Sequence, residues 1–392
     1  MDFSQMGLCV PRILLPCGEV DWQRWAVLAC DQYSSQPAYW KKIAEDVGDA
    51  PSTLHQIIPE CYLEDADVAQ RIDRAIDCMQ RYTVDGLLHQ WPEGTVLVER
   101  KIGETWRQGL MMAVDLEEYD YTPGAKPLIR PTEGTIVERI PPRLALRRKA
   151  SVEYPHIMIL IDDPDKTVIE PLAAEVGFET VYDFPLGWSG SDIRGRFVPW
   201  TALGGVHDAM LQLKEQSIER YGSAFLMAVG DGNHSLATAK AHWEEIKKNE
   251  GVSDHPARYA LVELVNVHSD ALVFEPIHRV LFDVPEDGAE EIARLQEKYA
   301  GSHSLPLGCM QNALDAYLAQ TPGVRIDFIH GMENAVELSA TPGALLFPQE
   351  VIQKKELFAS VANDGVLPRK SFSMGEADEK RFYLEGRTII KA

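Results

Sequence analysis

No apolar run in this 392-residue sequence approaches the roughly 20 residues that a helix needs to span a bilayer. Near the N-terminus, apolar residues are interrupted by Pro11, Arg12, Pro16 and Gly18, so we expect no targeting segment there. Basic residues are also few, 38 against 60 acidic ones, and the formal net charge of -22 repels phosphate backbones and anionic lipid. We therefore expect a cytoplasmic protein that binds neither nucleic acid nor membrane.

Cysteine and histidine patterns exclude two further classes of protein. The six cysteines form no C-x-x-C pair and no zinc-type cluster, so we expect free thiols in a reducing compartment. The eleven histidines show no H-E-x-x-H or comparable spacing, which gives a zinc hydrolase little support. The 45% hydrophobic content is enough for a buried core, and the length is typical of two or three domains or of one large α/β unit.

Segments of helix and strand character are mixed along the chain, which predicts a mixed α/β fold. Apolar periodicity predicts helices at 38–47, 65–83, 206–220, 235–249 and 286–300. Strands are predicted as a hairpin around Lys101 to Thr105, at 156–163, 224–229 and 258–267, as short strands after 300, and as a final strand at 381–389. We place boundaries near 205 and 285. They divide the chain into an N-terminal mixed α/β region (1–205), a motif-bearing α/β core (206–285) and a C-terminal α/β region (286–392), which one continuous fold could also contain.

The segment FLMAVGDGNHSLATAKAHWEE, residues 225–245, changes from an uncharged apolar run to a helical pattern. The run suits a strand buried on both faces, and the helix has one apolar stripe made by Leu236, Ala239, Trp243 and Ile246. Between strand and helix, the first helical N–H groups have no intrahelical partner, and the positive end of the helix dipole lies behind them. This combination predicts an anion site at the tip.

The residues of the tip have predicted roles in binding a phosphate. Gly230 and Gly232 permit tight turns and a close approach of the phosphate to the backbone. Gly232 and Asn233 are expected to present backbone amides to it. Asn233 or Ser235 either caps the helix or donates to a phosphate oxygen.

Asp231 is unexpected at an anion site, because its charge would repel a phosphate. It becomes useful if it binds Mg²⁺ carried by a nucleotide, or if it accepts a proton from a hydroxyl that attacks phosphorus. The alternative is that Asp231 only caps the helix and His234 only bonds backbone. A dinucleotide fold fits less well, because the following strand holds only Glu263, at its start. A P-loop would have Lys followed by Ser or Thr where this chain has His234 and Ser235.

Two other segments, FEPIHRVLF and LPRKSFSMGEADEKRFYLEG, bring basic and hydroxyl side chains next to prolines and glycines. The first contains a proline that limits strand pairing, and arginine offers a fork that matches phosphate. Each segment offers potential oxyanion binders, although any one such segment is more often a solvated loop. The candidate residues are His278, Arg279, Arg369, Lys370 and Ser371.

Two charged segments remain open to two interpretations each. IRPTEGTIVERIPPRLALRR has an arginine-rich face that we expect to meet an acidic region of the same protein, rather than a substrate carboxylate or phosphate. Its charged residues are Glu133, Arg139, Arg143, Arg147 and Arg148. HIMILIDDPDKTVIEPL ends an apolar strand in Asp162, Asp163 and Asp165, which either hold a hard cation or form an exposed Asp/Pro turn.

The segments AVGDGNHSLATAKAHWE, HIMILIDDPDKTVIEPL, EPIHRVLF and LPRKSFSMGEA resemble the bacterial family called domain of unknown function 1015, and they span most of the chain. Other members of that family carry D-G-H-H-R at the motif, where this chain has Asn233 and Ser235 in place of the first histidine and the arginine. The motif is also similar to one in the ParB/sulfiredoxin-like superfamily, which binds nucleotides and includes free-serine kinases. Without the motif arginine, phosphate binding would need Arg279 or Lys370 to supply the positive charge.

These observations predict a nucleotide-dependent phosphotransferase that acts on a small hydroxyl-bearing metabolite, with ATP or ADP and Mg²⁺ as cofactors. Asp231 is the predicted base or Mg²⁺ ligand, and the side chains predicted to neutralise charge during transfer are His234, Arg279 and Lys370. Two alternatives remain: a non-catalytic nucleotide-binding or interaction protein, and a metal-dependent phosphohydrolase built on the three aspartates at 162–165.

Overall fold

The computed structural model describes residues 1–391, which form two compact units. Unit 1 contains residues 1–131, 135–272 and 376–391, and unit 2 contains residues 132–134 and 273–375. This division differs from the three predicted regions, since strands from 1–205 and from 206–285 join the same sheet. The chain also returns to unit 1 after residue 375, which no local pattern in the sequence indicates.

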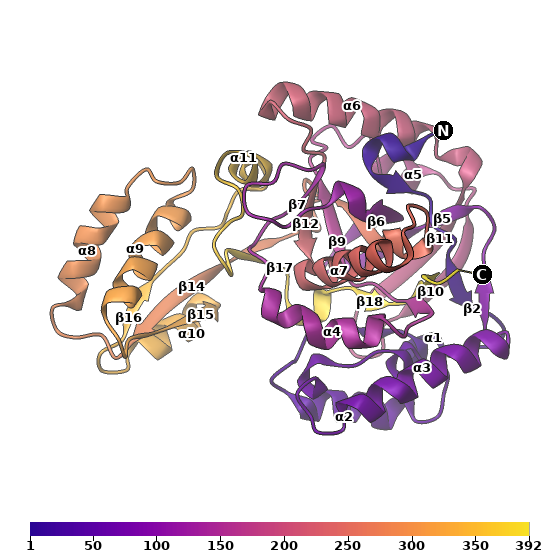
Figure 1. The fold of residues 1–392 in the computed structure, drawn as a ribbon, viewed down its shortest axis with the longest axis horizontal. Helices are drawn as coiled ribbons and strands as arrows, with labels where there is room; N and C mark the ends of the chain where they lie inside the picture. The colour runs from indigo at the N-terminus through magenta and orange to yellow at the C-terminus, as the bar shows by residue number, and fades with distance from the viewer. Residues whose placement is uncertain (392) are drawn as a thin grey trace. The chain divides into compact units, whose positions relative to one another are not determined.

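Unit 1 is built on a large mixed sheet (Figure 1). From edge to edge it contains β10 (Glu179–Pro185), β11 (Asp192–Pro199), β5 (Gly94–Ile102), β6 (Thr105–Asp115), β13 (Tyr259–Asn266), β9 (Met158–Ile161), β12 (Met227–Asp231) and β7 (Ile129–Pro131), and β1 (Leu8–Cys9) also pairs with β6. Short pairings join β2 (Leu14–Pro16) to β4 (Leu88–Gln90), β3 (Val27–Leu28) to β18 (Phe382–Tyr383), and β8 (Val152–Glu153) to β19 (Arg387–Thr388). The predicted hairpin is confirmed as β5 and β6, which pair Ile102 with Thr105 at their turn.

The helices of unit 1 confirm those predicted at 38–47, 65–83, 206–220 and 235–249. The α-helices are α1 (Trp22–Trp25), α2 (Pro37–Val47), α3 (Val68–Val84), α4 (Ile140–Arg147), α5 (Glu170–Ala174), α6 (Gly204–Tyr221) and α7 (Asn233–Glu250). Short 3-10 helices occur at Phe3–Met6, Thr53–Gln56, Glu60–Tyr62, Leu116–Glu118, Val137–Arg139, Trp200–Ala202, Pro256–Arg258 and Ala377–Glu379. Within residues 1–391, no helix combines the length and the apolar character that crossing a bilayer requires.

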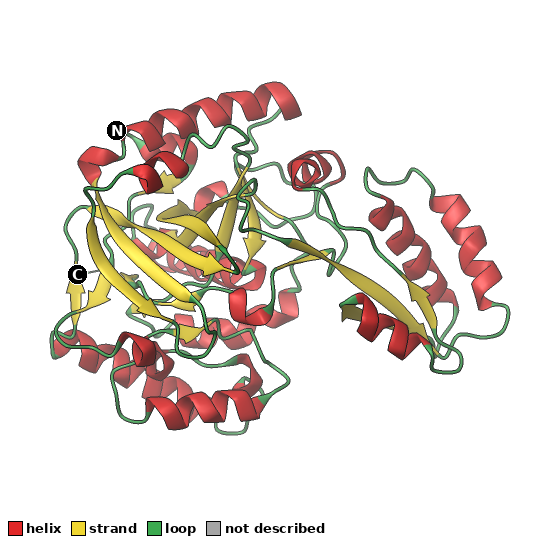
Figure 2. Cartoon of the chain, turned by 180° about the vertical axis from the view of Figure 1, so that it is seen from behind, coloured by secondary structure: helices red, strands yellow, loops and turns green. Residues whose placement is uncertain are grey.

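Helices cover both faces of the large sheet (Figure 2), which explains the uncharged runs in its central strands. On β6, Leu110 and Met112 belong to a core that includes residues of α6 and α7, whereas Met111 belongs to a second core with residues of α1, α2 and α3. The predicted stripe of α7 is confirmed, since Leu236 and Trp243 lie in the first core. The sheet therefore supports α7 along its whole apolar side.

Unit 2 is an antiparallel sheet with helices against it. β14 (Phe274–Phe282) pairs with β15 (Arg325–His330), β16 (Leu345–Phe347) and β17 (Phe372–Met374). The helices are α8 (Gly288–Tyr299), α9 (Pro306–Gln320), α10 (Met332–Ser339) and α11 (Lys354–Asp364). Thr132 joins this unit because its carbonyl accepts a hydrogen bond of 2.7 Å from the N–H of Leu367.

Two predictions for the last part of the chain were wrong. Only short strands were expected after residue 300, yet α9, α10 and α11 lie there; α9 begins at Pro306, a residue that suits a first helical turn as well as a loop. The single strand expected at 381–389 is instead β18 and β19, of two residues each. They pair in turn with β3 and β8, so no one neighbouring strand extends the pairing.

Buried ion pairs fasten the segment 376–391 to the large sheet. Nη1 of Arg381 lies 2.5 Å from Oε2 of Glu263 on β13, and its Nη2 donates to Glu385. These three side chains are 2% exposed or less. Gly109 on the neighbouring strand β6 leaves room for the network, because a Cβ there would lie 2.3 Å from Oε1 of Glu263.

Replacing Arg381 with methionine should lower the free energy of unfolding of unit 1 by about 3–5 kcal/mol, since two carboxylates then remain buried without their shared cation. The eight tryptophans all lie in unit 1, so urea denaturation followed by tryptophan fluorescence reports on this unit. Arg24→Met is the control, because its ion pair with Asp21 is half exposed and should be worth no more than about 1 kcal/mol. Equal losses in the two variants would contradict the role given to Arg381.

Candidate functional site

The motif forms a strand-to-helix tip in unit 1, as predicted. β12 ends at Asp231, Gly232 is the residue before the first turn of α7, and the pairing of β12 with β9 shifts register between Val229 and Asp231. Such a bulge changes the direction of the side chain that follows it. Gly232 has φ of 79°, and a Cβ on it would lie 3.0 Å from the Cα of Ile157. Glycine is therefore required here both by conformation and by space.

Asp231 does not cap α7 by bonding to N2 or N3. Its Oδ1 accepts from the N–H of Gly232 at 2.9 Å, and its Oδ2 lies 3.2 Å from Nζ of Lys380. The Asp231 side chain is 22% exposed and that of Lys380 is 11% exposed, so the pair is partly desolvated yet open to a ligand. The carboxylate is thus held by one backbone donor and one ammonium group at the end of the strand.

The N-cap residue of α7 is Gly232, which has no side chain with which to cap the first turn. The first intrahelical bond runs from the N–H of Leu236 to the carbonyl of Gly232. The N–H groups of the first three helical residues therefore take no part in the intrahelical hydrogen bonds. Nε2 of His234 accepts from the backbone N–H of Ile136 at 3.3 Å, which requires that nitrogen to be unprotonated. The side-chain oxygen of Asn233 is enclosed and has no hydrogen-bond partner among the described residues.

A second group of polar side chains lies beside the tip in unit 1. Nε2 of His156 is 3.2 Å from Oγ of Ser235 and 3.5 Å from Oδ2 of Asp31. Nδ1 of His156 is 2.7 Å from the hydroxyl of Tyr383, which also accepts from the N–H of Cys30. This is not the arrangement of a Ser-His-Asp triad, in which the carboxylate contacts Nδ1 and the serine contacts Nε2.

Charges couple this group to the tip. Burial alone would lower the pKa of His156, but the carboxylates of Asp31, Asp231 and Glu60 outweigh it, and the pKa is raised. Burial would raise the pKa of Asp31, yet His156, Gln32 and Lys380 hold it well below its usual range. Unit 1 therefore places a histidine with a raised pKa and the ammonium group of Lys380 near Asp231.

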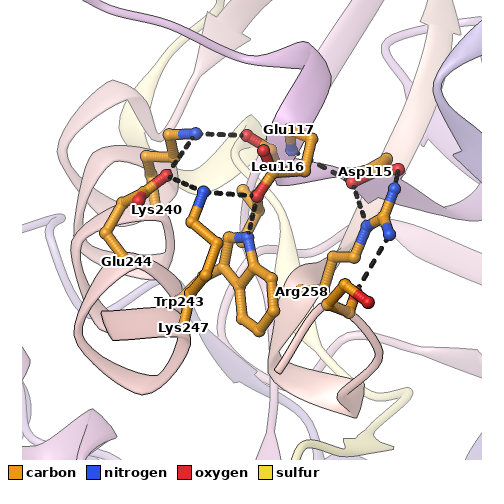
Figure 3. A network of polar contacts seen from close by, with 9 residues as sticks. Asp115, Leu116, Glu117, Lys240, Trp243, Glu244, Lys247 and Arg258 are labelled. Carbon is orange, nitrogen blue, oxygen red and sulfur yellow. Dashed lines mark hydrogen bonds and ion pairs between the residues drawn. The ribbon is translucent and has the colours of Figure 1, made fainter. Parts of the chain in front are cut away.

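Polar contacts along α7 fix the helix behind the tip (Figure 3). Nζ of Lys240 donates to the carbonyl of Leu116 at 2.8 Å, and Glu117 accepts from the indole N–H of Trp243 and from Lys247. Glu117 is partly buried at this contact. These polar contacts and the packing of its apolar side hold α7 in place, and with it the first turn of the helix.

The remaining predicted binders lie in unit 2. Nδ1 of His278 accepts from the N–H of Gln349 at 3.0 Å. Arg279 is fully buried, and its guanidinium donates to Gln311 and to backbone carbonyls; burial lowers its pKa to about 10. Ser371 is buried and Lys370 is exposed, with φ of 57°. The structure thus divides the predicted site between two units, and a composite site remains a prediction.

The arginine-rich face pairs with acids of unit 1, as expected from the sequence. Arg147 lies 2.8 Å from Glu153, Arg143 bonds Glu60, and Arg148 bonds Glu245.

The three aspartates at 162–165 are explained by structural contacts. Asp162 is paired with Arg220 and His268, and buried Asp163 accepts from the backbone N–H groups of Thr167 and Val168. Asp165 is exposed. Within residues 1–391 these carboxylates do not form a group of three metal-ligating side chains. The expected exposed turn is therefore present only at Asp165, and the contacts of Asp162 and Asp163 account for these two acids without a metal.

Asp31, His156, Lys380 and Tyr383 were not predicted from the sequence. His156 comes close to the tip through strand pairing, because Asp231 lies opposite Met158 and His156 precedes Met158 by two positions. Lys380 and Tyr383 flank Arg381, whose buried ion pairs were not apparent from the sequence. Unit 1 itself supplies a positive charge beside Asp231, on Lys380, together with His156, whose pKa is raised.

A mixed sheet covered on both faces, with an uncapped helix start and paired acids and bases at the end of one strand, defines unit 1 as an α/β unit with a candidate anion site. The chain belongs to the family described as protein of unknown function (DUF1015), whose model matches residues 14–384. A search of curated proteins finds no match.

Solved structures with some similarity include a free serine kinase in complex with AMP, with a TM-score of 0.35 and 10% identity over 71% of this chain and 91% of that chain. A variant of a free serine kinase in complex with ADP has a TM-score of 0.36 and 9% identity, over 71% and 92% of the two chains. A conserved hypothetical protein from Pyrococcus furiosus has a TM-score of 0.32 and 8% identity, over 70% and 90%.

Gly232→Ala should destabilise unit 1 more than Gly251→Ala, and the difference measures the contact with Ile157. Both glycines flank α7 with positive φ, 79° and 67°, so each alanine incurs a backbone cost of roughly 1–2 kcal/mol. Only position 232 adds steric overlap, worth about 1–3 kcal/mol, because nothing lies within 4 Å of a Cβ at position 251. Urea unfolding followed by tryptophan fluorescence gives both values, and identical losses would mean that the backbone at position 232 relaxes freely.

The pKa of His156 should lie above its ordinary value of 6.5 and should fall below it in Asp31→Asn, where burial dominates. Because the folded-state pKa is raised, His156 contributes stability that is complete below 6.5 and is lost as the pH rises through the raised value. NMR titration of the histidine ring signals measures this shift. His242, whose pKa burial lowers to about 4, is the internal control and should not respond to the substitution.

Proposed function

We propose that this protein is a nucleotide-dependent phosphotransferase that acts on a small hydroxyl-bearing metabolite. The observation that carries this proposal is the pair of Asp231 and Lys380 at the uncapped first turn of α7. Backbone N–H groups at a helix start and an ammonium group bind phosphate. A carboxylate beside them is useful only if it also accepts a proton or binds a cation. Phosphoryl transfer needs both functions at one place.

The proposed step assigns a role to each group at the tip. The terminal phosphate lies against the N–H groups of Asn233 and the next two helical residues, and Lys380 neutralises its charge. The substrate hydroxyl attacks phosphorus, so that a new oxygen–phosphorus bond forms as the bond to the nucleotide leaving group breaks. The hydroxyl proton passes to the carboxylate of Asp231, and the electron pair of the broken bond stays on the nucleotide.

His156 replaces His234 as the proposed cation. Nε2 of His234 accepts from Ile136, so the ring cannot be an imidazolium cation while that bond exists. His156, by contrast, has a raised pKa and lies within 3.2 Å of Ser235 on the first turn of α7. An imidazolium at this place stabilises charge on the transferring phosphoryl group.

ATP or ADP is the proposed donor, and Mg²⁺ would accompany it. Asp231 would share the ion with phosphate oxygens and water, which is the usual coordination of Mg²⁺ at phosphate sites. Within residues 1–391, no group of three metal-ligating side chains includes Asp231, which agrees with an ion that arrives with the nucleotide.

The second candidate is a protein that binds a nucleotide without turning it over. The ion pair between Asp231 and Lys380 favours it if the pair persists when phosphate is bound, because the carboxylate is then unavailable as a base. Turnover separates the two functions, since a kinase forms ADP from ATP, or AMP from ADP, only when an acceptor is present. Binding itself is measurable by thermal shift, because a nucleotide at 100 times its Kd stabilises the protein by about 2.7 kcal/mol.

Asp231→Asn should reduce turnover of ATP or ADP with a panel of small alcohols by about 10²-fold or more, because the proton acceptor is lost. Asn retains the oxygen that accepts from Gly232, so stability should change by no more than about 1 kcal/mol. Lys380→Met should instead weaken nucleotide binding by about tenfold.

The matched controls come from an exposed ion pair of unit 1, Lys149 with Asp73 at 2.8 Å. Lys149→Met and Asp73→Asn remove the same groups and should leave turnover and nucleotide affinity within twofold of the parent. A folded Asp231→Asn protein with full turnover would refute the base assignment.

A further inference from the structure

Unit 1 contains an apolar recess that reaches the first turns of α7. Ser235 and His156 lie in its wall, so the recess reaches the polar groups of the candidate site. Most of the remaining wall comes from α3, α4, residues 57–63 and residues 150–157. The apolar side chains that form it include Ile57, Ile58, Leu63, Ile72, Met79 and Leu146.

The size and charge of the recess restrict its occupant. Its volume is about 150 Å³, and a dry protein cavity of roughly that volume accepts a benzene-sized molecule. The charged side chains in its wall are already neutralised, since Arg143 bonds Glu60 and Arg147 lies 2.8 Å from Glu153. The recess therefore offers no unpaired charge to select an ionic group, and it is too small for a nucleotide.

Gln56 supplies an independent sign of a ligand. Its side chain lies in the wall of the recess and is 1% exposed. Oε1 accepts from the hydroxyl of Tyr154 at 3.2 Å, while Nε2 has no hydrogen-bond partner among the described residues. Buried donors of this kind are normally satisfied, and an oxygen atom of a molecule in the recess would satisfy this one.

We propose that the recess is the acceptor pocket and that the acceptor is an uncharged hydroxyl compound with an apolar body about the size of a benzene ring. The body contacts Ile58, Ile72 and Met79 and presents one acceptor oxygen to Nε2 of Gln56, while the hydroxyl faces Ser235 and His156. The inference rests on the proposed function for the fate of the hydroxyl, and it deepens that function by naming the substrate class. A sugar or another polyol of similar size would leave its hydroxyl groups unpaired against the apolar wall.

The test measures binding by the full-length protein without nucleotide, with benzyl alcohol and glycerol as probes in ligand-observed NMR titrations. Benzyl alcohol should bind at least tenfold more tightly than glycerol. Ala150→Leu adds a bulky side chain to the wall of the recess and should weaken benzyl alcohol binding at least tenfold. Ala173→Leu, a partly buried position packed against another core of the same unit, is the control and should change it less than twofold.

A second variant tests the pocket assignment even if Ala150→Leu does not fold. Ile72→Ala enlarges the recess and should increase the affinity for 4-ethylbenzyl alcohol severalfold relative to benzyl alcohol. Equal affinities for benzyl alcohol and glycerol, or an unchanged preference in Ile72→Ala, would overturn the pocket assignment.

Activity assays separate this inference from the proposed function. If phosphate is transferred to glycerol and never to benzyl alcohol, the phosphotransferase stands and the apolar pocket assignment fails. If benzyl alcohol binds and Ala150→Leu blocks it, while neither ATP nor ADP is turned over with any alcohol, the pocket assignment stands and the phosphotransferase fails.

Discussion

Arg381 joins a late segment of the chain to the central strand β13 through the buried carboxylate of Glu263, while Glu385 of the same segment holds its other side, and the candidate site depends on this joint. The residues on either side of it reach different parts of the site. Lys380 contacts Asp231 at the end of β12, and Tyr383 contacts His156. A guanidinium with partners on both sides tolerates little displacement, so it also fixes the positions of the neighbouring residues Lys380 and Tyr383.

Two glycines of unit 1 occupy places where a larger residue would not fit. Gly109 in β6 would otherwise carry a side chain into Glu263, and Gly232 would carry one into Ile157. Both glycines lie next to groups that the site needs, one beside the ion pairs and the other at the start of α7. Packing space has thus been left free for polar contacts in the middle of a large sheet, where a purely apolar core would have been the simpler solution.

The local elements of the fold could be predicted from the sequence, because each has its own periodicity. The hairpin of β5 and β6, the stripe of α7 and the strand-to-helix change at Gly230–Ser235 all have a pattern within about 20 residues. Strand order has no such local signal. β9 is antiparallel to β12 and parallel to β13, so β12, α7 and β13 do not form the parallel unit of a dinucleotide fold. His156 and Lys380 join Asp231 only through this order, and for that reason they were missed.

The order of synthesis follows from the way the two units share the chain. Unit 1 is interrupted by residues 273–375, and its last strands come from 376–391. A nascent chain that has reached residue 375 holds the whole large sheet and Arg107 beside Glu263, but it lacks Arg381, the second cation of Glu263, and the phenol that contacts His156. Domains generally fold as they emerge, yet here unit 2 can mature before unit 1 is closed. The ribosome therefore completes the scaffold first and the candidate site last, so a partly made chain remains without the ammonium and the phenol beside the tip.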